Sequence, residues 1–106
     1  MRIIVPDAER FVKAYASNDS ELWRQLGWDM ADLPPDIYTP MHVVNHVFHQ
    51  GGEHLFAYDF ETMKWVLRQA GFATIARQSF GVSSDPGLAI DQENHRPYSL
   101  YVEAIK

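Results

Sequence analysis

A chain of 106 residues is long enough to bury a core without disulfides, and its content of 46% hydrophobic and 22% charged residues is ordinary for a folded protein, which argues against wholesale disorder. The net charge of −5 argues against nucleic acid as a partner, because proteins that bind the phosphate backbone carry a clustered basic face. The sequence has no cysteine and no apolar run near the roughly 18 residues of a membrane span, so we expect a single cytoplasmic domain, residues 1–106, that does not bind a membrane.

The N-terminal quarter predicts a strand and two helices. Residues 2–5 are rich in β-branched side chains and predict a central strand, which Asp7 follows as the N-cap of a helix. Asn18 and Glu21 have the spacing of a capping box, which predicts a second, short helix that stops at Gly27. The first helix has apolar residues at three- and four-residue spacing, which predict a face turned toward a core: Ala8, Phe11, Val12 and Tyr15.

A proline-rich loop over residues 28–40 precedes the next predicted helix. Thr39 and Pro40 have the residue types of an N-cap and a first helical position, and the pattern predicts a helix to about residue 50 that ends at the glycine pair 51–52. One face of this helix is apolar and consists of Met41, Val44 and Phe48. Another face is polar and consists of His42, Asn45, His46 and His49.

The C-terminal half predicts one helix and two strands. Asp59 is the expected N-cap of a helix that ends at Gly71. Its expected apolar stripe consists of Phe60, Met63, Val66, Leu67 and Ala70. Residues 73–81 and 98–106 predict strands, separated by a loop over 82–97. Because no helix joins these two strands, we expect them to be antiparallel neighbours or to lie close to that arrangement.

Four short motifs carry a resemblance to a known family. They are "IVPD" at residues 4–7, "HLFAYDFET" at 54–62, "LRQAGF" at 67–72 and "SLYVEAIK" at 99–106. In this order and spacing, the chain resembles the C-terminal half of a class I S-adenosylmethionine-dependent methyltransferase of a small type.

The resemblance implies an α/β architecture, a partial Rossmann-like methyltransferase fold. Residues 3–5 would be the fifth strand of that fold, 74–80 the sixth and 98–105 the seventh. The expected sheet has about three strands in the order fifth, seventh, sixth, with the last strand antiparallel, and carries helices.

The same resemblance implies the chemistry of methyl transfer from S-adenosylmethionine to an unidentified acceptor. In the family, a Gly-rich turn after the first strand and an acidic residue after the second hold that cofactor. The sequence contains no G-x-G, and its one glycine pair, residues 51–52, follows a predicted helix rather than a strand. We therefore expect no cofactor to bind this chain alone and no activity of the chain by itself, as in a truncated family member.

Five residues are candidates for binding the acceptor, because the resemblance places the acceptor beside the segment after the fifth strand and beneath the inserted helices. They are Asp7, His46, His49, His54 and Tyr58. A histidine in such a place can take up a proton near neutral pH. The alternative interpretation, which we favour, is that Asp7 only caps a helix and the histidines line a solvated face.

A metal site is a further hypothesis, since His42, His46 and His49 share one helical face, with Glu53 and His54 beyond it. Zinc accepts imidazole and carboxylate ligands. Three histidines from one helix seldom complete a tetrahedron, however, and no HExxH motif is present, so we predict no metal.

The predicted first strand has consequences for assembly. If the sheet keeps only three strands, the apolar run at residues 3–5 lies at an open edge, which is a pairing hazard. We therefore expect a homo-oligomer or pairing with a separate N-terminal half. A non-catalytic dimerising or binding module is accordingly the alternative to a methyltransferase, and a histidine-based metal protein is a weaker one.

Overall fold

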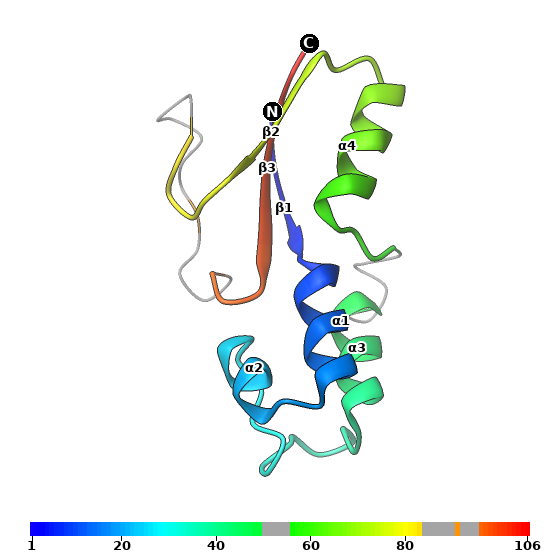
Figure 1. Ribbon diagram of the computed structural model, residues 1–106, viewed down its shortest axis with the longest axis vertical. Coiled ribbons are helices and arrows are strands. Elements are labelled where there is room, and N and C mark those ends of the chain that lie inside the picture. The colour runs from blue at the N-terminus through cyan, green and yellow to red at the C-terminus, as the bar shows by residue number, and fades with distance from the viewer. Residues whose placement is uncertain (50–55, 84–90, 92–95) are drawn as a thin grey trace. The chain divides into compact units, whose positions relative to one another are not determined.

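The computed structural model describes residues 1–49, 56–83, 91 and 96–106 (Figure 1). The chain divides into two compact units, which are described separately. The sheet unit comprises Met1–Asp7 and Tyr58–Lys106, and the helical unit comprises Ala8–Ala57. Three strands and four helices confirm the predicted mixed α/β class. No helix in the described ranges is long and apolar enough to cross a membrane.

The sheet unit contains three strands: β1 (Arg2–Pro6), β2 (Thr74–Gln78) and β3 (Ser99–Ile105). Their order is β1-β3-β2, and both outer strands run antiparallel to β3. The last strand therefore lies in the middle and is antiparallel, as predicted, and β1 and β2 point the same way. β1 lies at an edge of the described sheet, as predicted for a sheet of three strands, although its β-branched composition alone suggested a central strand, because composition does not give a strand's place in a sheet.

The register of β1 decides which of its backbone groups face outward. Met1 and Ala104 exchange two backbone hydrogen bonds of 2.9 Å, and the Asp7 amide donates to the Tyr98 carbonyl at 2.8 Å. Hydrogen-bonded pairs alternate along an antiparallel ladder. The backbone groups of Arg2 and Ile4 therefore point away from β3, toward the open edge.

Helix α4 (Phe60–Gln69) covers one face of the sheet (Figure 1). Its Met63 and Leu67 are buried against the side chains that β3 directs to this face: Leu100, Val102 and Ala104. The predicted cap and end are confirmed, since the Asp59 carboxylate accepts the Thr62 amide at 2.8 Å and Gly71 has a φ of +97°. The stripe is narrower than predicted: Val66 and Ala70 are exposed, because a ten-residue helix needs only its central turns to cover three short strands.

The opposite face of the sheet is held by a buried arginine, in what we call the Arg2 network. The Arg2 guanidinium makes five hydrogen bonds, one for each of its N–H donors. Two go to the Asp91 carboxylate at 3.0 and 2.6 Å, and one goes to Glu103 at 3.4 Å. The others reach the carbonyls of Val82 at 2.7 Å and Ser79 at 3.0 Å. Arg2 thereby ties the connection after β2 to β1 and β3.

The helical unit consists of α1 (Ala8–Ser17), α2 (Ser20–Gln25) and α3 (Pro40–His49). Its core is aromatic: the Phe11 ring lies edge-on to Trp23 at 6.1 Å and to Phe48 at 5.4 Å between centroids. The predicted α1 stripe was partly wrong. Phe11 and Ala14 are buried, whereas Val12 and Tyr15 are 62% and 46% exposed, so the buried line follows i, i+3 spacing and leaves the adjacent apolar positions in solvent.

The cap of α2 lies one residue later than predicted. The Asp19 carboxylate accepts the Glu21 amide at 2.9 Å. Asn18 instead ends α1 in the left-handed conformation, with a φ of 52°, and its amide donates to the Ala14 carbonyl at 3.1 Å. Asparagine tolerates this conformation better than most residues, so it serves as a helix end here. The predicted stop at Gly27, with a φ of +93°, is confirmed.

Helix α3 begins as predicted, with the Thr39 hydroxyl accepting the His42 amide at 3.1 Å. Its buried residues are Val43 and Val47, whereas Met41 of the predicted apolar face is 44% exposed. Two neighbouring apolar lines run along this helix, and the alternation of residue types does not decide which one meets the core. The glycine pair predicted to end the helix lies outside the described residues.

Candidate functional site at the carboxyl edge of the sheet

Three residues of the sheet unit come together where β1 and β2 end, and we call them the carboxyl-edge cluster: Asp7, Tyr58 and Arg77. Asp7 follows β1 directly, and Tyr58 forms a parallel bridge with it just before α4 begins. Arg77 comes from β2, where it pairs in register with Val102. Because Val102 faces α4, Arg77 also stands on the α4 side of the sheet. The cluster thus gathers residues that are far apart in the sequence.

Asp7 is the buried member of the cluster. Its side chain is 1% exposed, and one carboxylate oxygen accepts a hydrogen bond from Nη2 of Arg77 at 2.9 Å. A carboxylate taken out of water is strongly destabilising unless it is paired and hydrogen-bonded. Arg77 supplies that pairing, which the prediction of Asp7 as only a helix cap did not foresee.

Arg77 is the exposed member of the cluster, with 45% of its side chain in contact with solvent. Sequence analysis missed it. The signal that would have found it is its place in the strand, since alternation from Ile75, which packs against the core, puts a charged side chain on the face that α4 covers. Asp7 is the buried anion that this side chain reaches.

Two tyrosines contribute to this edge: Tyr58, the third member of the cluster, and Tyr98, which adjoins it. Tyr58 is half-buried and packs against the core beneath α4. Tyr98 is the backbone partner of Asp7, and burial raises the pKa of its phenol.

The structure brings together two of the five predicted acceptor-binding residues, Asp7 and Tyr58. His46 and His49 lie on α3 in the helical unit, where both are exposed. The His46 ring lies edge-on to Trp28 at 5.7 Å. His54 lies outside the described residues.

The histidine face of α3 does not form a metal site in the described residues, where no group of three or more histidine, cysteine, aspartate or glutamate side chains is placed to hold an ion. Nδ1 of His42 accepts a hydrogen bond from the Tyr38 amide at 3.3 Å, and the centroids of the two rings lie 5.7 Å apart. That nitrogen is therefore engaged by the backbone of the preceding loop.

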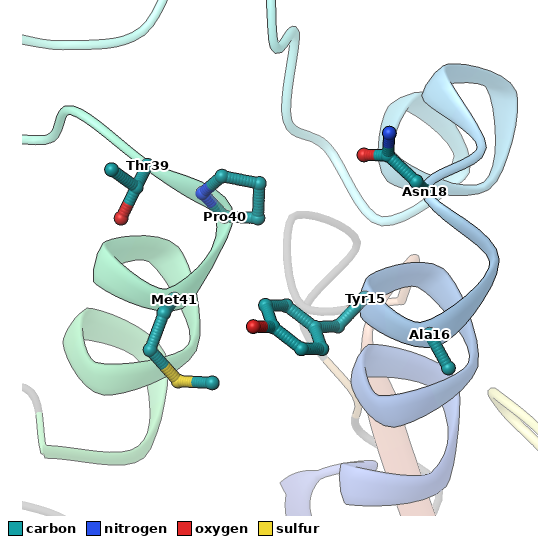
Figure 2. Close-up of a pocket in the computed structure, with 6 residues that line it drawn as sticks. All are labelled: Tyr15, Ala16, Asn18, Thr39, Pro40 and Met41. Atoms are coloured by element: carbon teal, nitrogen blue, oxygen red, sulfur yellow. The ribbon is translucent and has the colours of Figure 1, made fainter.

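The helical unit has a pocket of about 540 Å³ between the end of α1 and the start of α3 (Figure 2). It is lined by uncharged residues: Tyr15, Ala16, Asn18, Thr39, Pro40 and Met41. The side chains of Tyr15 and Met41 point toward one another across it (Figure 2). The sequence assigned both to core stripes, so it did not predict this pocket.

Comparison of the chain with protein-family models, with curated proteins and with solved structures finds no match in any of the three. The features of the chain that bear on its function are the sequence motifs, the strand order and the carboxyl-edge cluster.

Proposed function

We propose that this chain forms the C-terminal, acceptor-side part of a class I S-adenosylmethionine-dependent methyltransferase fold. The observation that carries the proposal is the order β1-β3-β2 with an antiparallel middle strand, together with a helical connection from β1 to β2 whose last helix, α4, packs on the sheet. The same order and direction are expected of the fifth, seventh and sixth strands of that family. The four sequence motifs support the same assignment, since they fall at the end of β1, around α4 and on β3.

The chemistry of the reaction gives the carboxyl-edge cluster its role in this proposal. Methyl transfer requires the acceptor to be held in line with the donor methyl group, so the protein acts largely by positioning. In open α/β sheets, ligands bind outside the carboxyl ends of the strands. Asp7, Tyr58 and Arg77 stand at this edge in the sheet unit, and the acceptor would meet them there.

The donor is not held by these 106 residues in our proposal, because no Gly-rich turn follows a strand in the sequence. The backbone amides that cradle S-adenosylmethionine would come from polypeptide outside this sequence. We place the assembled enzyme in the cytoplasm, which the absence of cysteine supports.

Calorimetry with S-adenosylhomocysteine tests this proposal in two arms. We expect no binding by the 106-residue chain. We expect micromolar binding by a polypeptide extended upstream of Met1, if the coding sequence there contains an in-frame strand followed by a Gly-rich turn. Micromolar binding by the 106 residues alone, or an upstream sequence without those elements, would overturn the proposal.

A second candidate function is a non-catalytic dimerising or binding module. The open edge of β1 favours it, because the outward backbone groups of Arg2 and Ile4 have no partner strand among the described residues. In a longer protein this edge would pair with the N-terminal half, and in the 106-residue chain with a second copy.

A further inference from the structure

We propose that Arg77 is a binding residue for a carboxylate group on the methyl acceptor. The inference rests on the proposed function and goes beyond it by naming the chemical class of the acceptor. It comes from the way in which the carboxyl-edge cluster holds this one guanidinium.

Arg2 and Arg77 of the sheet unit differ in how their donors are used. Arg2 is 4% exposed and spends all five N–H donors within the protein. Arg77 makes one hydrogen bond, to Asp7, and its other donors have no protein partner in the part of the chain that the structure describes. Arg2 is thus a structural tie, whereas Arg77 has 45% of its side chain exposed and uses one hydrogen bond to hold its guanidinium.

The ion pair with Asp7 restrains Arg77, which is therefore not a freely moving surface charge. Asp7 is buried and holds Nη2, so the planar group is oriented before any ligand arrives. Pre-organisation of this kind reduces the entropy lost on binding. A guanidinium presents parallel N–H donors that match the two oxygens of a carboxylate.

Charge favours a carboxylate over a phosphate as the partner. The chain has a net charge of −5, and Asp7 already neutralises part of the Arg77 charge. The negative charge of the protein and of Asp7 would repel a dianion more strongly than a monoanion. The acceptor that fits the site is therefore a carboxylic acid, bound at the edge where the proposed reaction takes place.

Nuclear magnetic resonance of the 106-residue chain tests this inference without the donor. Sodium acetate, methyl acetate and inorganic phosphate are titrated separately at constant ionic strength, and the side-chain Nε–H signal of Arg77 is followed. We expect a saturable shift with acetate and none with methyl acetate. Saturation by phosphate and not by acetate would overturn the carboxylate assignment, and the absence of saturation with either anion would overturn the site.

Variants separate binding from folding. Arg77→Gln removes the cation that pairs with the buried Asp7 carboxylate, so the double variant Asp7→Asn/Arg77→Gln is measured beside it, with the fold of each verified by circular dichroism. We expect acetate binding to weaken about tenfold or more in both, followed at the backbone amides of Tyr58 and Gln78, as for the loss of one charge-assisted hydrogen bond. Arg68→Gln, on an exposed position of α4, should leave binding unchanged. Equal weakening in Arg68→Gln would contradict the inference.

These results are independent of the test of function. Acetate binding at Arg77 without any donor binding by the extended polypeptide would remove the methyltransferase proposal and leave the anion site. Donor binding by the extended polypeptide without acetate binding would do the reverse.

Discussion

At the scale of single residues, Arg2 is the buried cation that holds two carboxylates of the sheet unit. Asp91 and Glu103, its two carboxylate partners, have side chains that are 1% and 6% exposed. Replacing Arg2 with methionine keeps the length of the side chain and leaves both carboxylates buried without their cation. We expect the Arg2→Met variant to lose about 3–5 kcal/mol in the free energy of unfolding, measured by urea denaturation at pH 7.

A matched control comes from an exposed ion pair of the same residue type. Arg24 lies 3.3 Å from Glu21 on α2, and both side chains are more than half exposed. Arg24→Met should therefore cost at most about 1 kcal/mol. The hydrogen bonds from Arg2 also hold the pKa of Asp91 below its usual value, so Arg2→Met should raise that pKa. Similar losses of stability in the two variants would show that the Arg2 network does not carry the stability assigned to it.

At the scale of elements, the sequence predicted the termini of helices better than their buried faces. Asp59, Thr39 and Gly71 lie where predicted because caps and left-handed ends depend on a few neighbouring atoms. Val12 and Met41 were assigned to cores and are exposed. The face that a helix buries depends on what packs against it, and that information is not contained in the helix's own periodicity.

Substitutions at the cap of α4 should separate the effect of the Asp59 charge from that of its hydrogen bond. The Thr62 side chain and amide lower the pKa of Asp59 by hydrogen bonding to its carboxylate. A lowered pKa in the folded state contributes stability above the unfolded pKa of about 3.9, and this contribution is lost as the pH falls through the lower folded value. Asp59→Ala should cost about 1 kcal/mol at pH 7, and progressively less as the pH falls below the unfolded pKa of about 3.9.

Asp59→Asn is the control for that experiment, since asparagine caps helices about as well as aspartate but does not titrate. It should cost little at pH 7 and remove the pH-dependent part contributed by this position. Urea denaturation of all three proteins between pH 2 and 7 measures the effect. A difference between Asp59→Ala and the unmodified chain that stays constant over this range would contradict the assigned role of the carboxylate.

At the scale of the whole molecule, the strand order was predictable from the sequence. Of the residues at the carboxyl edge of the sheet, only some were predictable. The family resemblance predicted the order, and the loop predicted over residues 82–97 between β2 and β3 indicated their antiparallel pairing. Asp7 and Tyr58 were found because they lie in the recognised motifs. Arg77 lies 70 residues from Asp7 in the chain, and only the register of β2 on β3 brings the two together.

The open edge of β1 should govern how the chain self-associates. The amide of Ile4 points outward, away from β3, and its side chain is 39% exposed. Proline at position 4 removes this outward donor and no hydrogen bond of the ladder, and edge strands tolerate proline in such positions. Sedimentation velocity should show that the unmodified chain self-associates with rising concentration and that Ile4→Pro stays monomeric. Ile4→Val keeps the amide and the apolar surface, so it should associate like the unmodified chain. If the unmodified chain stays monomeric at high concentration, the proposal that a second copy occupies this edge is wrong. If Ile4→Val loses association, side-chain volume rather than strand pairing drives the association.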